Sequence, residues 1–243
     1  MKIYISIFIV LAATGVLLSA NKWLQQWRFL FSNNAYVDNQ IKYQTLLLLT
    51  ALGVLILTYL LNKESFISLF SIGNINAPTE KMPLFGIKEG DKWLETGLSL
   101  SVVITSVTAI FMYYQLKPYT VNWHLLAQGM GWILLFSLTN SFGEEAIYRL
   151  GILLPLKGML PPTSLFLISA VLFGIPHFAG MPNGMIGVLM ASILGFVLAK
   201  SVYETNGIFW AWLIHFLQDV VIIGTIYMMK MSVETLSSAS ESI

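Results

Sequence analysis

The sequence predicts an all-α protein, a polytopic transmembrane helical bundle of about seven spans, with six to eight as the range. The chain of 243 residues is 56% hydrophobic and has a mean hydropathy of +0.75. Only 10% of its residues are charged, whereas soluble domains carry about 25%. Long apolar segments also recur along the chain, and a spanning helix needs about 20 mostly apolar residues.

The first apolar segment is interpreted as an uncleaved span and not as a signal peptide. Cleavage after Ala20 would need a small residue two positions earlier, and the sequence has Leu18 there. The fourth segment is longer than one crossing requires. The candidate spans are 3–20, 44–61, 96–115, 125–154, 165–181, 184–200 and 207–229.

A polar stretch at 66–93, with two prolines and mixed charges, divides the chain. We find no internal repeat. The expected organisation is an N-terminal two-span region at 1–65, a loop or interfacial hairpin at 66–93, a five-span helical core at 94–230 that carries the intramembrane ionisable groups, and a disordered Ser-rich tail at 231–243.

Composition also limits partners and location. The net charge of +1 provides no basic surface for nucleic acid. The absence of cysteine excludes disulfides and thiolate nucleophiles, and leaves His, Asp and Glu as ligands for any metal. Seven lysines fall on the N-terminal side and five Lys or Arg on the other, which with Arg149 makes the thirteen of the chain. This bias favours a cytoplasmic N-terminus in a multi-pass membrane protein.

The stretch SFGEEAIYRL concentrates charge inside an apolar region. Between residues 121 and 199 the chain has four charged residues, and three of them are Glu144, Glu145 and Arg149. Each ionised side chain at mid-bilayer costs about 2.5–3.5 kcal/mol. Glu145 and Arg149 are four apart and can pair on one helix face. Glu144 is rotated by about 100° from Glu145, so it is left unpaired as a candidate general base. The alternative is a helix end among lipid headgroups, without chemistry.

Two further segments carry intramembrane histidines. In LFGIPHF, Phe173 and His177 are four apart, and Pro176 removes a backbone hydrogen bond and loosens the helix there. In WLIHFLQDV, His215 and Asp219 are four apart, so that the carboxylate can fix the imidazole tautomer or share a ligand with it. A single helical histidine is also a common packing residue.

Depth along the spans brings these groups to one level. At about 1.5 Å per residue, Glu144 lies roughly 15 Å, His177 roughly 18 Å, His215 roughly 12 Å and Asp219 roughly 18 Å from the same face. Three spans therefore predict one shared polar site. His124 is read as an interfacial residue. The sequence has no zinc-protease or paired-aspartate motif, and no G-x-S nucleophile turn beside a usable histidine.

Three motifs in order, E-E-x-x-x-R, F-x-x-x-H and H-x-x-x-D, resemble those of the CPBP family. This family comprises the type II CAAX prenyl endopeptidases and the bacteriocin-processing or self-immunity proteins, also called Abi. The motif-bearing part runs from about Leu94 to Met229, a little over half of the chain. The resemblance implies an intramembrane endopeptidase for membrane-associated protein or peptide substrates, with a cavity open to the cytosol and the membrane.

The resemblance also implies roles for individual residues. The candidate catalytic residues are Glu144, Glu145, Arg149, His177, His215 and Asp219. Glu144 would activate a water, assisted by His177. The third motif would stabilise the oxyanion, and the Glu145–Arg149 pair would hold the helix and its charge balance. Phe173 is a candidate substrate-binding residue.

One departure and several alternatives stay open. The third motif commonly ends in Asn, which can donate to an oxyanion, whereas an ionised Asp219 cannot. No metal site is assigned; if zinc is the cofactor, its ligands would be Glu144, His177, His215 and Asp219. The alternative functions are a non-proteolytic immunity or scaffold protein of the same family, and a small proton-coupled transporter, although transporters usually show duplicated halves. The sequence does not indicate an oligomeric state.

Overall fold

The structure is a computed structural model that describes residues 1–24, 26–119 and 122–241, without the side chains of residue 21 and of those from 233 on. Its α-helices are α1 (Lys2–Leu24), α2 (Ala35–Leu61), α3 (Lys63–Leu69), α4 (Trp93–Leu116), α5 (Trp123–Glu145), α6 (Gly151–Leu156), α7 (Pro162–Gly174), α8 (Gly184–Thr205) and α9 (Phe209–Glu241). Three short turns of other types are the 3₁₀-helices η1 (Pro83–Phe85) and η3 (Ile175–Ala179) and the π-helix η2 (Ala146–Leu150).

The predicted all-α bundle of seven spans is confirmed within the described residues. The segments that are long and apolar enough to cross a membrane are Lys2–Ala20, Ala35–Leu61, Trp93–Leu116, Trp123–Leu156, Pro162–Ala179, Gly184–Thr205 and Phe209–Ser232. The overlong fourth span consists of α5, η2 and α6 in succession. Pro176 acts as expected, because regular α-helix gives way to η3 just before it.

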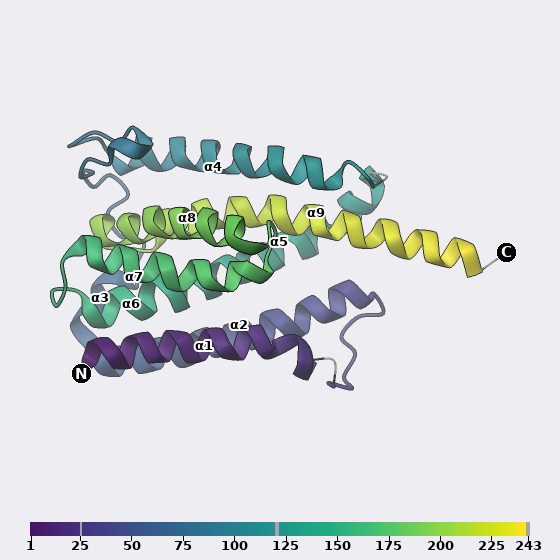
Figure 1. Cartoon of the computed structure of the whole chain (residues 1–243), viewed down its shortest axis with the longest axis horizontal. Helices are drawn as coiled ribbons and strands as arrows, with labels where there is room; N and C mark the ends of the chain where they lie inside the picture. Colours follow the sequence, from purple (N-terminus) through teal and green to yellow (C-terminus); the bar gives the residue numbers. More distant parts are fainter. Residues whose placement is uncertain (25, 120–121, 242–243) are drawn as a thin grey trace.

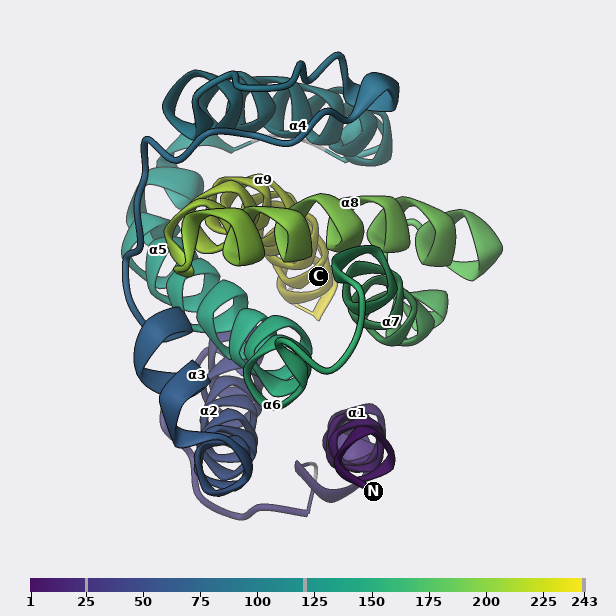
Figure 2. The same cartoon turned by 90° about the vertical axis from the view of Figure 1, so that its left-hand side faces the viewer.

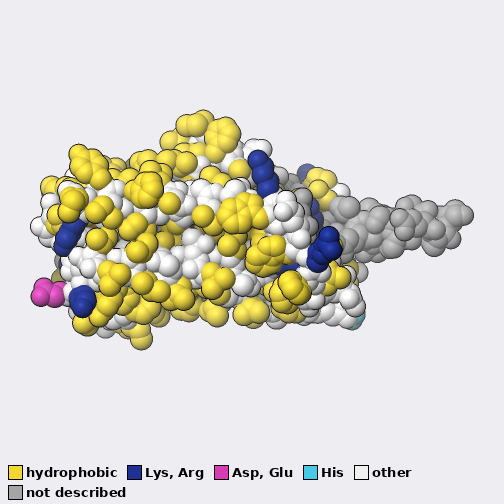
Figure 3. Space-filling model, turned by 90° about the horizontal axis from the view of Figure 1, so that it is seen from below, with side chains coloured by type: hydrophobic (Ala, Val, Ile, Leu, Met, Phe, Trp, Pro, Cys, Tyr) yellow, Lys and Arg dark blue, Asp and Glu magenta, His cyan; other side chains and the backbone are white. Residues whose placement is uncertain are grey.

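The helices form one bundle around the fourth span (Figures 1 and 2). Helix α9 packs along α5, and α4 packs on the outer side of α9. Helices α7 and α8 pack against each other, while α1 and α2 form a pair that covers η2 and α6. Seen from below Figure 1, the surface is largely hydrophobic, with charged side chains toward its ends (Figure 3), as expected for a surface that faces lipid.

Glycines allow two of these helix pairs to approach closely. A Cβ on Gly143 would lie 2.6 Å from Leu47 Cγ, and one on Gly97 would lie 2.3 Å from Trp210 Cε3. Small residues at such interfaces bring helix backbones together in a membrane. Gly143 directly precedes Glu144, so the close contact brings α2 against the part of α5 that carries the glutamates.

The polar stretch 66–93 includes a small hairpin-like loop, with isolated antiparallel bridges at Pro78–Lys92 and Met82–Ile87. Trp93 Nε1, at its end, donates a hydrogen bond of 2.8 Å to Glu204 Oε2 on α8, and Glu204 also pairs with Lys200. At the other end of the chain, α9 continues to Glu241, through most of the segment 231–243 for which the sequence predicts disorder. Residues 242–243 lie outside the described part of the chain.

Candidate active site

The two adjacent glutamates at the end of α5 have different surroundings. Glu145 is fully buried, and its Oε2 lies 3.1 Å from Arg149 Nε, so the structure contains the ion pair expected from the spacing. Its other oxygen, Oε1, accepts a hydrogen bond of 2.8 Å from His215 Nδ1. Glu145 is thus held between a cation and an imidazole, and its two oxygens have separate partners.

A π-turn carries the arginine of this pair. Residues Ala146–Leu150 form η2, and such turns are frequent at functional sites. The Arg149 side chain is fully buried, and its guanidinium carbon lies 4.0 Å from the centre of the Phe173 ring. A cation over an aromatic face is stabilised most strongly where water is excluded. The carboxylate and the ring offset part of the cost of burying this charge, while Nη1 and Nη2 have no hydrogen-bond partner among the described residues.

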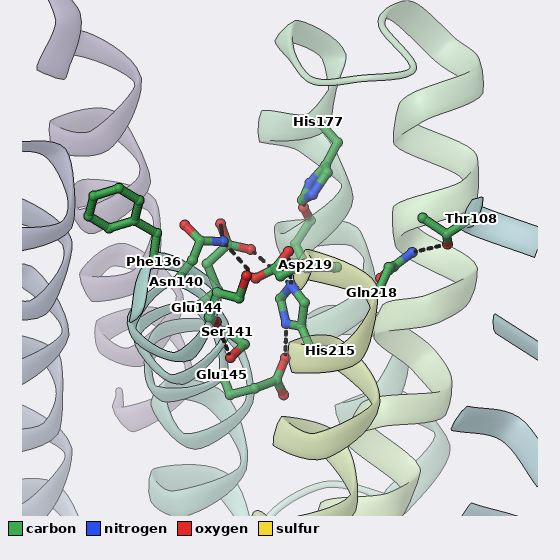
Figure 4. A network of polar contacts seen from close by, with 12 residues as sticks. Thr108, Phe136, Asn140, Ser141, Glu144, Glu145, His177, His215, Gln218 and Asp219 are labelled. Carbon is green, nitrogen blue, oxygen red and sulfur yellow. Dashed lines mark hydrogen bonds and ion pairs between the residues drawn. The ribbon is translucent and has the colours of Figure 1, made fainter. Parts of the chain in front are cut away.

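The partner of His215 differs from the one that the sequence suggested. The spacing allowed Asp219, four residues on, either to fix the imidazole tautomer or to share a ligand with it, and the 2.8 Å bond from Nδ1 goes to Glu145. A carboxylate only accepts hydrogen bonds, so this contact assigns the hydrogen to Nδ1. Nε2 then points toward Glu144 Oε2 at 3.6 Å and Asp219 Oδ1 at 3.7 Å (Figure 4). The spacing of His215 and Asp219 within α9 could not reveal that Glu145 on α5 lies closer to Nδ1.

Glu144 and His177 line the same cavity of about 290 Å³. His177 Nδ1 lies 2.8 Å from the carbonyl oxygen of Phe173, which only accepts, so Nδ1 carries a hydrogen and Nε2 is the free nitrogen. Glu144 Oε2 has no hydrogen-bond donor among the described residues. The cavity is lined by Leu17, Leu18, Tyr43, Glu144, Tyr148, Pro176, His177, Ala179 and Gly180.

Phe173 lies behind this cavity. Its ring is 1% exposed and packs against His177, with ring centres 4.6 Å apart, and against His215 and Tyr148, each at 5.5 Å. It therefore provides a packing surface for both histidines and for Arg149. A direct contact of Phe173 with substrate stays a prediction.

Sequence reasoning missed several uncharged members of the site. Asn140 Nδ2 donates to Glu144 Oε1 at 3.2 Å and to Asp219 Oδ2 at 3.1 Å (Figure 4). Its position one helical turn before Glu144 was a signal that could have identified it. Gln44 on α2, which hydrogen-bonds Asn140, had no such signal, because it lies in a distant span.

A zinc ion would need a different arrangement of these side chains. A zinc site has three or four ligand atoms that converge at about 2.0–2.2 Å from the ion. Among the described residues, no group of three or more His, Asp or Glu side chains has such an arrangement. In addition, the amide of Asn140 directs its hydrogens at both Glu144 and Asp219, and hydrogen-bond donors do not face a cation. The residues as arranged do not fit a zinc ion.

Comparison with known families agrees with the motifs. Residues 126–221 match the model of the family described as type II CAAX prenyl endopeptidase Rce1-like. The match covers less than half of the chain and extends from α5 into α9, so it includes both glutamates, both histidines and Asp219. Neither the curated proteins nor the solved structures gave a match. This segment is thus similar to the Rce1-like family, which is a family of proteases, and it lies in a chain with seven helices long and apolar enough to span a membrane within the described residues.

Proposed function

We propose that the protein hydrolyses peptide bonds of membrane-associated proteins or peptides, with Glu144 as the general base. The observation that carries this proposal is that Glu144 and His177 line the same cavity. Beside them lies His215, whose ring Glu145 orients. Glu144 lines the cavity, and its Oε2 has no hydrogen-bond donor among the described residues, so this carboxylate keeps an oxygen that can accept a proton from water. The family match supports proteolysis at the level of the family.

The first step forms the tetrahedral intermediate. Glu144 takes a proton from a water in the cavity, assisted by His177, while the water oxygen bonds to the scissile carbonyl carbon. Negative charge moves to the carbonyl oxygen. A protonated His215, surrounded by three carboxylates, donates to this oxyanion through Nε2. The fixed orientation of the ring matters here, because a donor that is already aimed loses no energy to reorganisation.

The second step breaks the peptide bond. The oxyanion collapses, the bond between carbon and nitrogen breaks, and Glu144 returns its proton to the leaving amine. No atom outside the substrate, the water and these side chains is consumed. The proposed mechanism is metal-free, and glutamate-dependent.

The test is cleavage of a membrane-tethered peptide library by the purified protein in liposomes, beside Glu144→Ala and Glu144→Gln. Removal of a general base costs about 10²–10⁴-fold in rate. We expect both variants to insert and fold, and to lose proteolysis by that factor. Turnover of Glu144→Gln at the wild-type rate would refute the assignment, and a wild type that cleaves nothing would favour a scaffold or immunity role.

The protein is an integral multi-pass membrane protein, and we propose the bacterial inner membrane as its location. Leu17 and Leu18 place the cavity toward the end of the bundle where α1 ends, away from Lys2. A cytosolic cavity therefore requires the N-terminus on the opposite side, against the weak lysine bias. We propose the orientation with the cavity in the cytosol. The chain has no cysteine, so a single Cys introduced at Lys2 should react with an impermeant thiol reagent from outside the cell; protection there would reverse the orientation.

A further inference from the structure

Asn140 occupies the centre of the site without belonging to any of the three motifs. Its Nδ2 donates to Glu144 Oε1 at 3.2 Å and to Asp219 Oδ2 at 3.1 Å. Because carboxylates only accept, the amide nitrogen, and not the amide oxygen, must face them. Both hydrogens of this one amide are therefore used to join the proposed base on α5 to the carboxylate on α9 (Figure 4).

The orientation of this amide is set from α2. Gln44 Nε2 donates to Asn140 Oδ1 at 3.4 Å, and Gln44 Oε1 accepts from Thr139 Oγ1 at 2.9 Å. Gln44 is buried. The close packing of Leu47 on Gly143 brings this part of α2 to α5. Two side-chain amides from different spans thus form a directed series of hydrogen bonds that ends on Glu144.

The two hydrogen bonds from Asn140 reduce the repulsion between Glu144 and Asp219. Glu144 and Asp219 both approach His215 Nε2, at 3.6 and 3.7 Å. Two carboxylates that share a site repel each other. A neutral double donor between them offsets this repulsion without adding charge. It also occupies Oε1 of Glu144, so the orientation of Oε2 is fixed.

We propose that Asn140 is a positioning residue for proteolysis: it holds the Glu144 carboxylate through Oε1, separates it from Asp219, and takes its own orientation from Gln44. This inference rests on the proposed role of Glu144. It also accounts for the carboxylate at position 219. Asn140 on α5 faces Asp219 on α9, and because Asn140 is the amide of this pair, its partner on α9 must accept its hydrogen bond. An exchange of the two side chains would preserve one amide and one carboxylate.

The test compares Asn140→Asp, Asp219→Asn and the double variant that carries both changes, by kcat and KM on the same cleaved substrate. Asn140→Asp places a further carboxylate beside Glu144 and removes its donor. We expect kcat to fall about 100-fold with little change in KM, the loss that misplacement of a reacting group by about 1 Å causes. The double variant returns the number of carboxylates around His215 Nε2 to that of the wild type and again pairs an amide with a carboxylate between α5 and α9. Glu144 Oε1 still lacks its donor, so we expect a partial recovery of about tenfold.

Gln218 offers a matched control. It is another intramembrane side-chain amide, adjacent to Asp219, and it donates to Thr108 on α4 at 3.1 Å, away from Glu144. Gln218→Leu should keep kcat within about threefold, less than 1 kcal/mol of barrier. Thermal unfolding of every variant shows whether a loss is due to misfolding.

The outcomes distinguish this inference from the proposed function. A wild type that cleaves and a Glu144→Gln that does not, together with full activity in Asn140→Asp, would overturn the role of Asn140 alone. A kcat of the double variant no higher than that of Asn140→Asp would also overturn the role of Asn140. If Asn140 only stabilised the fold, Asp219→Asn would not restore activity. Loss of the Glu144 dependence itself would remove both proposals.

Discussion

The segment that matches the family, 126–221, and the N-terminal helix pair α1–α2 contribute to the site in different ways. The matched segment supplies the carboxylates, the arginine and the histidines, namely Glu144, Glu145, Arg149, His177, His215 and Asp219. In the contacts described, the N-terminal pair supplies neutral ones, namely Thr14, Leu17, Leu18, Tyr43 and Gln44. Thr14 Oγ1, for example, lies 3.1 Å from Tyr148 Oη.

The difference has an energetic reason. A charge inside the membrane is tolerated where it is paired. The ion pairs of the site join residues of α5, η2 and α9, all within the matched segment. The N-terminal pair can then vary in sequence at lower cost, because it contributes shape and neutral hydrogen bonds. The reacting groups should therefore come from the matched segment, whereas α1 and α2 should affect substrate access and, through Gln44, the orientation of Asn140. Three changes test this division.

The largest expected effect is on stability, in the matched segment. Arg149→Ala leaves the fully buried Glu145 without its cation and removes the contact with the Phe173 ring. Breaking one side of a buried ion pair costs about 3–5 kcal/mol. We expect a lower yield of folded protein and a lower melting temperature in detergent.

The double variant Arg149→Ala with Glu145→Gln checks the cause. The glutamine introduced by the second change is neutral, and its amide oxygen can still accept from His215 Nδ1, so part of the stability should return. Losses that simply add in the double variant would show that the two side chains act independently.

Much of the fold could be predicted from the sequence, because a membrane imposes a strong requirement. A spanning helix needs a long apolar run, so the spans could be recognised without knowledge of their packing. The Glu145–Arg149 pair was predictable for a similar reason, since both residues lie on one helix at a fixed spacing. The common depth of Glu144, His177 and His215 followed from the rise per residue.

Two of the missed contacts of the site, those of Glu145 with His215 and of Gln44 with Asn140, lie between helices. Glu145, and not Asp219, binds His215 Nδ1, because α9 packs along α5 in a register that spacing within α9 does not reveal. Asn140 and Gln44 were missed because a neutral amide costs much less free energy in a membrane than a charged side chain does, so its presence alone does not indicate a functional site. The π-turn at Ala146–Leu150 has no clear pattern in the sequence.

A smaller effect is expected in the N-terminal pair, on access and not on chemistry. Leu18 lines the cavity and is 53% exposed. Leu18→Trp should raise KM about tenfold and leave kcat nearly unchanged, since a change of shape in an apolar pocket is worth about 1–3 kcal/mol. Leu11 lies two turns earlier on the same helix face and is 46% exposed, so Leu11→Trp is the matched control and should behave as wild type. Equal effects of both changes, or a fall in kcat, would contradict the division between chemistry and access.

The smallest effect is expected at Asp219, the residue of the matched segment that departs from the commoner asparagine. In a metal-free mechanism, Asp219→Asn keeps an oxygen that accepts from Asn140 and adds a donor beside His215. Activity should then stay within tenfold of wild type, less than about 1.4 kcal/mol. Chelators should have little effect.

A metal-dependent mechanism predicts the opposite for the same change. Asp219 would then be an anionic ligand, and replacing it with neutral Asn should weaken metal affinity or activity by about 10–100-fold. The decisive measurement is the zinc content of the purified protein beside its activity with and without chelator. Stoichiometric zinc, with activity lost on chelation and restored by zinc, would overturn the metal-free mechanism. It would also require Asn140 to turn away from Glu144 and Asp219, because its amide hydrogens now point at the oxygens that such an ion would need.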